Sequence, residues 1–265
     1  MKITSLVENT CSTGLPVEHG LSLYIETEEH TILFDMGQSD LFVRNAEELG
    51  VDLGRADFAV LSHGHYDHGG GLAKFLEINR SAPVYLSCHT FEPHYNGTEK
   101  YIGLDSSLLD SSFAENERLI FTDKAIEIGK GITLYPVSET GRYPMQYDMG
   151  TGGLNMVSDG KIVPEDFRHE QYMVIEENGK RILFSGCSHK GILNIVSWFE
   201  PDVLIGGFHF SKLEPDDRLK EYAEILDSHD TEYYTCHCTG VRQFEFMKSY
   251  MKKLNYLAEG EVVII

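Results

Sequence analysis

The segment from Leu61 to Gly70 constrains the fold of this chain more than any other. It contains three histidines and an aspartate, and it directly follows the uninterrupted apolar run at residues 58–61. Such a run is typical of a buried strand, and apolar residues recur at helical spacing from Leu72 onward. Because imidazole and carboxylate groups bind divalent metals such as zinc, the pattern predicts a metal site on a strand-to-helix turn. Alternate positions can converge on one ion while the turn carries His68 toward another.

A lone loop histidine is usually a solvated surface residue, but a cluster of this density has no structural use on a bare turn. The string His63-x-His65-x-Asp67-His68 resembles the signature of the metallo-β-lactamase superfamily. Three later segments extend the resemblance over nearly the whole chain, to a branch of metal-dependent hydrolases related to archaeal dihydropterin–ribofuranosylaminobenzene phosphate synthase. These segments are Gly186-Cys187-Ser188-His189, Gly206-Gly207-Phe208-His209 and His237-Cys238-Thr239-Gly240.

The resemblance implies an α/β fold of the αββα sandwich type, with a metal site between two sheets. We expect a single domain over residues 1–265, which is long enough to bury a large core. Residues 91–118 lose periodicity and are interpreted as an insertion or lid near the site. Residues 138–168 show no clear element and are a second candidate wall of the pocket. The last helix is expected to carry apolar residues from Phe244 to Leu254.

Histidines follow the ends of five apolar runs, and ligands bind where strand ends gather in layered α/β folds. These histidines are at positions 63, 65 and 68, then 89, 189, 209 and 237. The other histidines, His19, His30, His94, His169 and His229, are interpreted as surface residues.

By resemblance, His63 and His65 hold a first metal, and Asp67, His68 and His237 hold a second. Two departures from the superfamily pattern matter. Residues 138–141 lack the usual histidine after the middle strand, and Cys187 replaces a bridging aspartate. His189 is the natural substitute ligand. Cys187 is either a thiolate ligand or a buried, inert cysteine.

Two divalent ions are therefore expected, with zinc favoured and manganese or iron as alternatives. Such an ion lowers the pKa of bound water, which then acts as the nucleophile at neutral pH. Asp67 and His209 are the candidate catalytic residues. His209 is interpreted either as a proton donor or substrate contact, or as a hydrogen-bonded support of the site. Asp35 is either a support of the metal loop or a plain turn residue.

Arg142 and Lys190 are the basic residues nearest the expected rim, and they are candidate anchors for an anionic substrate. The alternative for each is a solvated surface charge. The chain has 42 acidic and 22 basic residues and a net charge of −20, which argues against nucleic acid or an anionic membrane as a partner. A small anionic molecule is the expected partner, and a homo-oligomer is compatible with the sequence.

Five cysteines form an odd set, and two of them flank His237, so a disulfide framework is not expected. The first residues lack an apolar leader and no stretch reaches the length of a membrane span, which predicts a soluble, unprocessed, cytoplasmic protein.

These patterns predict a metal-dependent hydrolase that acts on a small anionic substrate, such as a phosphodiester or an ester. One alternative is a transferase resembling the pterin/aminobenzene-phosphate synthase, with the same metal site and a tight pocket that excludes water. Another is a non-catalytic metal or ligand sensor with a saturated coordination sphere. The substrate itself rests on analogy with the superfamily.

Overall fold

Two seven-stranded sheets form the body of the protein in a computed structural model that describes residues 1–109, 117–139, 142–150 and 152–265. The first sheet runs in the order β18 (Val262–Ile264), β1 (Lys2–Val7), β2 (Ser22–Glu26), β3 (Thr31–Phe34), β4 (Phe58–Val60), β5 (Val84–Ser87) and β8 (Leu119–Thr122). The second runs in the order β17 (Leu254–Tyr256), β16 (Glu232–Thr235), β15 (Val203–Gly206), β14 (Lys180–Phe184), β13 (Gln171–Glu177), β10 (Ile132–Pro136) and β9 (Ile126–Gly129).

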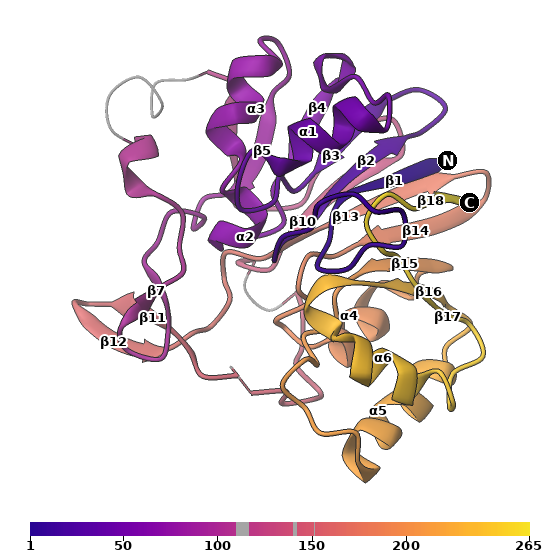
Figure 1. Cartoon of the computed structure of the whole chain (residues 1–265). Coiled ribbons are helices and arrows are strands. Elements are labelled where there is room, and N and C mark those ends of the chain that lie inside the picture. The colour runs from indigo at the N-terminus through magenta and orange to yellow at the C-terminus, as the bar shows by residue number, and fades with distance from the viewer. Residues whose placement is uncertain (110–116, 140–141, 151) are drawn as a thin grey trace.

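Helices cover the outer face of each sheet, which confirms the αββα class (Figure 1). The helices are α1 (Leu41–Glu48), α2 (Tyr66–Gly69), α3 (Leu72–Ile78), α4 (Ile192–Phe199), α5 (Asp217–Asp227) and α6 (Val241–Met247), with short 3₁₀ segments η1 (Leu53–Arg55), η2 (Ser106–Leu109) and η3 (His237–Thr239). Alternating apolar residues of the strands meet between the sheets, for example Phe34 of β3 against Phe184 of β14, with ring centroids 5.8 Å apart. The opposite faces pack against α1 and α3 on one side and against α4, α5 and α6 on the other.

The loops that follow the parallel strands lie at one edge of each sheet. In the first sheet β3 and β4 are parallel neighbours, and in the second β14, β15 and β16 are parallel neighbours. The loops that carry Asp35 and the metal-loop histidines leave the carboxyl ends of the first pair. The loops that carry His189, His209 and His237 leave those of the other three. The topology therefore gathers the predicted site residues at one edge of the sandwich.

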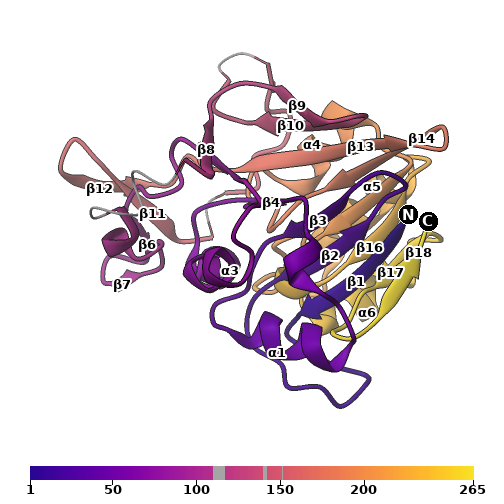
Figure 2. The same ribbon diagram turned by 90° about the horizontal axis from the view of Figure 1, so that it is seen from above.

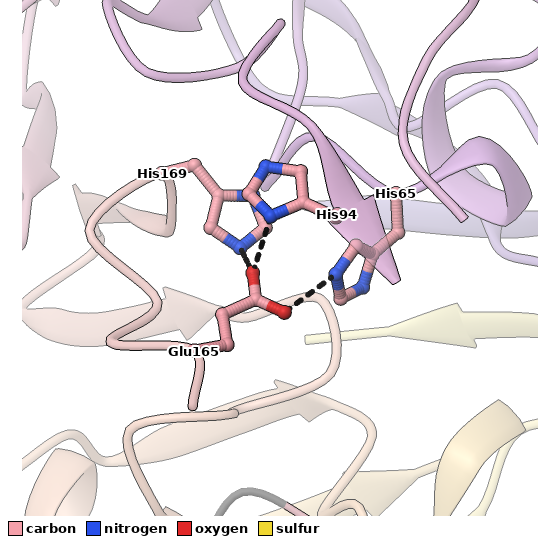
Figure 3. Close-up of side chains that lie close together, drawn as sticks. All are labelled: His65, His94, Glu165 and His169. Atoms are coloured by element: carbon pink, nitrogen blue, oxygen red, sulfur yellow. Dashed lines mark ion pairs between the residues drawn. The ribbon is translucent and has the colours of Figure 1, made fainter. Parts of the chain in front are cut away.

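A third, smaller sheet stands beside the sandwich (Figure 2). Its strands are β12 (Lys161–Pro164), β11 (Leu154–Ser158), β6 (His94–Asn96) and β7 (Lys100–Tyr101). It brings His94 and Glu165 next to His65 (Figure 3). The expected insertion at 91–118 thus contributes half of this sheet, although its residues 110–116 lie outside the described part. The expectation that 138–168 has no clear element was wrong, because β11 and β12 pair with each other and with β6.

Two other expectations fail locally. The predicted last helix ends at Met247, and Leu254 opens β17 instead. Met251 and Leu254 keep helical spacing in sequence, yet a turn after Met247 lets them enter the same core. Asp40 stands at the N-terminus of α1, but its carboxylate bonds Arg44 and not a backbone N–H. None of the helices in the described ranges combines the length and the apolar character needed to span a bilayer.

Candidate metal centre

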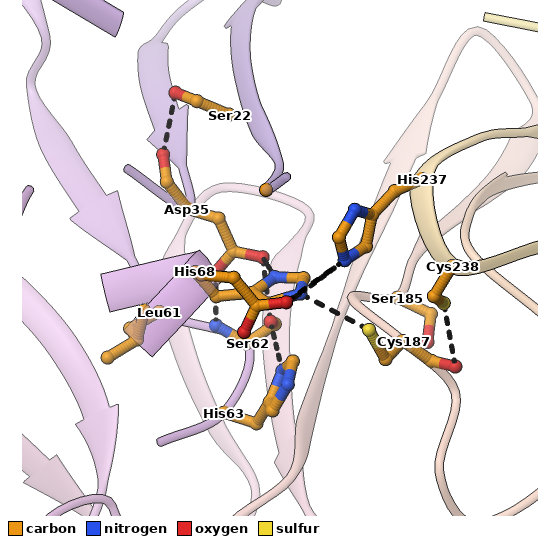
Figure 4. Close-up of polar contacts among 12 residues, drawn as sticks. Ser22, Asp35, Leu61, Ser62, His63, His68, Ser185, Cys187, His237 and Cys238 are labelled. Carbon is orange, nitrogen blue, oxygen red and sulfur yellow. Dashed lines mark hydrogen bonds and ion pairs between the residues drawn. The ribbon is translucent and has the colours of Figure 1, made fainter. Parts of the chain in front are cut away.

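The metal loop leaves β4, and the buried carboxylate of Asp35 holds it through Ser62 and His68 (Figure 4). Asp35 Oδ1 accepts the Ser62 backbone N–H at 2.7 Å, and its Oδ2 accepts the Ser62 hydroxyl at 2.7 Å. His68 Nδ1 lies 2.6 Å from the same Oδ2. Asp35 directly follows β3 and has a backbone φ of +59°. This left-handed conformation directs its side chain toward the metal loop. Of the two interpretations given above, support of the metal loop is the one that these contacts favour.

Hydrogen bonds at one ring nitrogen fix which nitrogen of each histidine can bind a cation. The Ser62 hydroxyl proton goes to Asp35, so Ser62 Oγ accepts from His63 Nδ1 at 2.8 Å. His68 Nδ1 donates to Asp35, and His237 Nδ1 donates to the side-chain oxygen of Asn9 at 2.8 Å. All three Nε2 atoms therefore carry a free lone pair, which is the state that a metal ligand requires.

Two of the groups that the ligand atoms form overlap at Cys187. In one, His63, Cys187 and His189 bring a ligand atom each to within 4.8 Å of one another. In the other, His68 Nε2 lies 3.2 Å from Cys187 Sγ and 3.3 Å from His237 Nε2. Cys187 belongs to both groups, so its sulfur lies where a bridging ligand would be needed.

Two further predicted ligands adjoin these groups. The His65 ring lies 4.7 Å from the ring of His63 and 4.9 Å from that of His189. Asp67 Oδ2 lies 3.3 Å from His237 Nε2 and 4.0 Å from His68 Nε2. The structure thus brings together all six histidine and aspartate ligands that the sequence predicted, and Cys187 with them.

Several ligand side chains of this site are uncharged because they are buried and lie close together. Burial, and then the neighbouring histidines, hold the pKa of both His63 and His189 well below the usual range, so these rings are neutral. Burial raises the pKa of the Cys187 thiol well above its usual value. Among the described residues, His63 Nε2 and both ring nitrogens of His189 are buried without a hydrogen-bond partner. A divalent cation would satisfy these atoms and favour the Cys187 thiolate, so the residues present fit a metal.

Asp67 differs from its neighbours because it is charged. Burial alone would raise its pKa, but His68, His19 and His237 together hold the pKa well below the usual range. His19, which the sequence placed on the surface, is indeed exposed, yet its Nε2 lies 3.2 Å from Asp67 Oδ2. The sequence offered no signal for this contact, since His19 stands alone between β1 and β2.

Two histidines expected at the surface are buried instead. His94 and His169 have exposed fractions of 1% and 0%, and their rings stack 4.0 Å apart beside His65. The expectation was wrong because β6 and the start of β13 converge only when the small sheet forms. His89 shows the opposite error. Although it follows an apolar strand, its side chain turns away from the site and bonds Glu92 at 2.9 Å.

His209 lies beside the first group, with its ring 4.4 Å from that of His189. Its backbone has a φ of +57°, and its N–H donates to Cys238 Sγ at 3.3 Å. The half-buried ring reaches the same pocket as the predicted metal ligands, and its Nδ1 has no hydrogen-bond partner among the described residues. This position allows contact with a bound molecule; the catalytic role of His209 stays a prediction.

A pocket of about 140 Å³ opens above the ligand groups. Its wall includes Tyr66, Ile102 and Leu154, and it is also lined by two lysines, Lys100 of β7 and Lys212 beyond His209. Within the described part of the chain, neither lysine has a carboxylate partner within 4.0 Å; Lys212 Nζ bonds the Gly152 carbonyl at 3.1 Å.

The predicted anchors lie elsewhere. Arg142 is exposed, pairs with Glu139 at 3.1 Å and stacks over Tyr135, and it does not line this pocket. Lys190 follows His189, but its Nζ is bonded to the carbonyl of Asp166. Basic residues adjacent in sequence to a ligand can point away from it, which sequence alone does not reveal.

Fold and site together define a metallo-β-lactamase-type protein. The family model of the metallo-β-lactamase superfamily matches residues 15–227, and the chain belongs to this superfamily. An uncharacterized protein of Methanocaldococcus jannaschii is 29% identical over 98% of this chain and 97% of its own length. From the same organism, 7,8-dihydropterin-6-methyl-4-(beta-D-ribofuranosyl)-aminobenzene-5'-phosphate synthase is 26% identical over 99% of this chain and 96% of that protein.

A solved structure agrees over the full length. Tm1679, described as a metal-dependent hydrolase of the beta-lactamase superfamily, superposes with a TM-score of 0.83 at 29% identity, covering 100% of this chain and 99% of that one. The resemblance inferred from the motifs is thereby confirmed.

Proposed function

We propose that this protein is a metal-dependent hydrolase that acts on a small anionic substrate. The observation that carries the proposal is the pair of ligand groups that meet at Cys187, one with His63 and His189 and one with His68 and His237. Metal ions held by these residues would supply the Lewis acidity that activates water for attack near neutral pH. Zinc suits the nitrogen and sulfur donors, with manganese or iron as alternatives.

The chain's own residues divide the remaining work. Asp67, which lies close to His237, would help to hold the second ion, and His209 at the pocket wall would hold or deliver a proton. Lys100 and Lys212 support an anionic substrate, because they are positive side chains at the pocket of a chain whose net charge is −20. The expectations of a cytoplasmic location and of no nucleic-acid or membrane partner stay part of this proposal.

Metal content and hydrolysis can be measured together. Elemental analysis of the protein purified without added metal should give about two ions per chain. His189→Ala should lose one, and it should also lose hydrolysis of bis(p-nitrophenyl) phosphate. A histidine variant outside the pocket, His229→Ala, is the control and should retain both. Native protein with one ion or none, or a His189→Ala variant with its full complement, would contradict the ligand set.

A transferase is the second candidate, and the 26% identity to the pterin synthase favours it. Two bound ions without phosphodiester or ester hydrolysis, together with saturable binding of a reduced pterin, would support this alternative. Two bound ions with neither hydrolysis nor pterin binding would leave the sensor interpretation.

A further inference from the structure

The two residues that follow β1 contact the last predicted metal ligand through both its ring and its backbone. They are the buried Glu8 and the half-buried Asn9, which stand 229 and 228 residues before His237 in the chain. β1 and β3 are both antiparallel to β2, so β1 ends at the edge of the sheet where the site lies. The contacts with His237 therefore come from the fold and not from local sequence.

The backbone of His237 has a conformation that its surroundings must hold. Its φ is +49°, in the left-handed region that residues other than glycine seldom adopt. The Glu8 carboxylate accepts the His237 backbone N–H, and Asn9 Nδ2 donates to the His237 carbonyl at 3.3 Å. Glu8 is itself held by the Tyr256 hydroxyl at 2.8 Å and by the Thr10 backbone N–H at 2.6 Å. Both ends of the strained residue are thus fixed by side chains from the segment after β1.

The amide of Asn9 is oriented by a donor whose role is unambiguous. The Gly20 backbone N–H donates to Asn9 Oδ1 at 3.2 Å, which identifies this atom as the amide oxygen. The same oxygen lies 2.8 Å from His237 Nδ1, in hydrogen-bond geometry. Because an amide oxygen only accepts, the ring proton of His237 lies on Nδ1, and Nε2 keeps the lone pair that a metal binds.

The amide nitrogen of Asn9 disfavours a competing ion position. His19, Asp67 and His237 each bring a ligand atom to within 4.8 Å of one another, which is a second arrangement that could hold an ion. Asn9 Nδ2 donates to His19 Nδ1 at 3.3 Å, and a ring whose Nδ1 accepts carries its proton on Nε2. His19 Nε2, which lies 3.2 Å from Asp67 Oδ2, therefore has no lone pair for an ion. The same amide thus favours His237 over His19 as a metal ligand.

We propose that Asn9 is a positioning residue of the metal centre: its oxygen keeps the ring proton of His237 on Nδ1 and presents Nε2 to the second metal, while its amide nitrogen holds the carbonyl of the same histidine. The inference rests on the proposed metal site. Partners of this kind orient the ligand ring and raise its basicity, and their removal typically weakens metal binding by roughly 10–100-fold.

The test is zinc affinity in Asn9→Leu, measured by competition with a chelating dye. Leucine has nearly the size of asparagine but neither its acceptor nor its donors. We expect about two zinc ions per chain at saturation in both proteins, and the ion held by Asp67, His68 and His237 should bind roughly 10–100-fold more weakly in the variant. An unchanged affinity for the other ion would show that the variant is folded.

Two further variants separate the role of the amide oxygen from packing. Asn255→Leu is the matched control, because Asn255 is also half-buried and bonds Glu232 at 3.3 Å, but it lies on β17 and does not line the pocket. Its zinc affinities should be those of the native protein. Asn9→Asp keeps an acceptor for His237 Nδ1 and loses only the amide donors. It should recover most of the affinity that Asn9→Leu loses, whereas a role in packing alone would give equal losses in both.

A spectroscopic readout follows the ring proton itself. Nitrogen NMR of histidine-labelled, zinc-loaded native protein should show His237, assigned by comparison with His237→Gln, bound through Nε2 with a protonated Nδ1. This proton should exchange with water faster in Asn9→Leu. Unchanged zinc affinity or unchanged exchange in Asn9→Leu, equal affinity losses in both Asn9 variants, or zinc bound through Nδ1 would overturn the inference and leave the metal centre intact.

The outcomes for the proposed function are distinct from these. The expected zinc affinities without hydrolysis of bis(p-nitrophenyl) phosphate would overturn the hydrolase and leave the inference standing. Native protein that binds no zinc would overturn the proposed function, and the inference with it.

Discussion

The two halves of the candidate metal centre are built in different ways. The first half is one continuous loop from His63 to His68, tied to a single carboxylate, Asp35. The second half consists of separate residues that follow two different strands, Cys187 and His189 after β14 and His237 after β16. Local sequence specifies the first half, whereas only the order of parallel strands assembles the second. A substitution that disturbs the loop should therefore affect all of the ligands that the loop carries. A substitution that disturbs one of the separate residues should affect only the metal bound there.

The largest effect is expected from Asp35→Ala. The substitution leaves the Ser62 N–H and the His68 ring proton buried without an acceptor, so the free energy of unfolding should fall by about 3–5 kcal/mol. Both metals should be lost, because the loop carries ligands of both groups. Urea unfolding of the metal-free protein and metal analysis measure the two effects. Asp40→Ala, at an exposed position, should change stability by less than about 0.5 kcal/mol.

Glu170→Ala tests the second half of the candidate metal centre, as Asp35→Ala tests the first half. The buried Glu170 accepts the backbone N–H groups of His189 and Lys190 at 2.8 and 3.1 Å and the hydroxyl of Tyr172 at 2.6 Å. Its loss should cost about 1–3 kcal/mol and release the metal at His189, while the metal held by His68 and His237 remains. Loss of both ions in this variant would show that the halves are not independent.

Acid should destabilise the metal-free protein. Burial and neighbouring histidines lower the pKa of His63 and His189 and lower that of His169 to about 3. Below pH 6.5 the unfolded chain therefore binds more protons than the folded one, so stability is complete above pH 6.5 and falls as the pH drops toward the lowered values. Urea unfolding at pH 7, 6 and 5 should show a loss on the order of 1 kcal/mol per pH unit for each such histidine. His169→Gln should reduce the slope, and an unchanged slope would mean that His169 is not neutral in the fold.

The smallest effects are expected at the pocket rim. Lys100→Ala and Lys212→Ala should each raise the KM for bis(p-nitrophenyl) phosphate roughly two- to fivefold at unchanged kcat, as expected for exposed charges. Lys220→Ala, on α5 and outside the pocket, should leave KM unchanged. If KM rises in Lys212→Ala but not in Lys100→Ala, the substrate contacts only the side of the pocket formed by the second half of the metal centre.

The same division explains what the sequence could predict. The metal loop was recognised because its ligands lie within six residues, and His189 and His237 because each follows an apolar strand. His94 and His169 were misassigned since no local pattern marks them; their burial depends on the pairing of β6 with β11 across about sixty residues. His89 follows a strand too, yet Glu92 draws it away from the site.

Electrostatic partners were the least predictable. The sequence predicts Arg142 as an anchor from its charge, but Glu139, three residues earlier, forms an ion pair with it. Lys100 had no such signal, and it faces the pocket only because β7 is paired with β6. The roles of the predicted residues in catalysis and the single-domain organisation stay predictions.

The small sheet also limits how this protein can be re-engineered. Its two hairpins are hydrogen-bonded to each other through β6 and β11, and together they carry Lys100 and Leu154 on the pocket side and His94 and Glu165 on the metal side. A graft that exchanged one hairpin for that of a relative would break the pairing and alter both sides at once. The substrate range of a relative should therefore be transferred only when both hairpins are exchanged together as one unit.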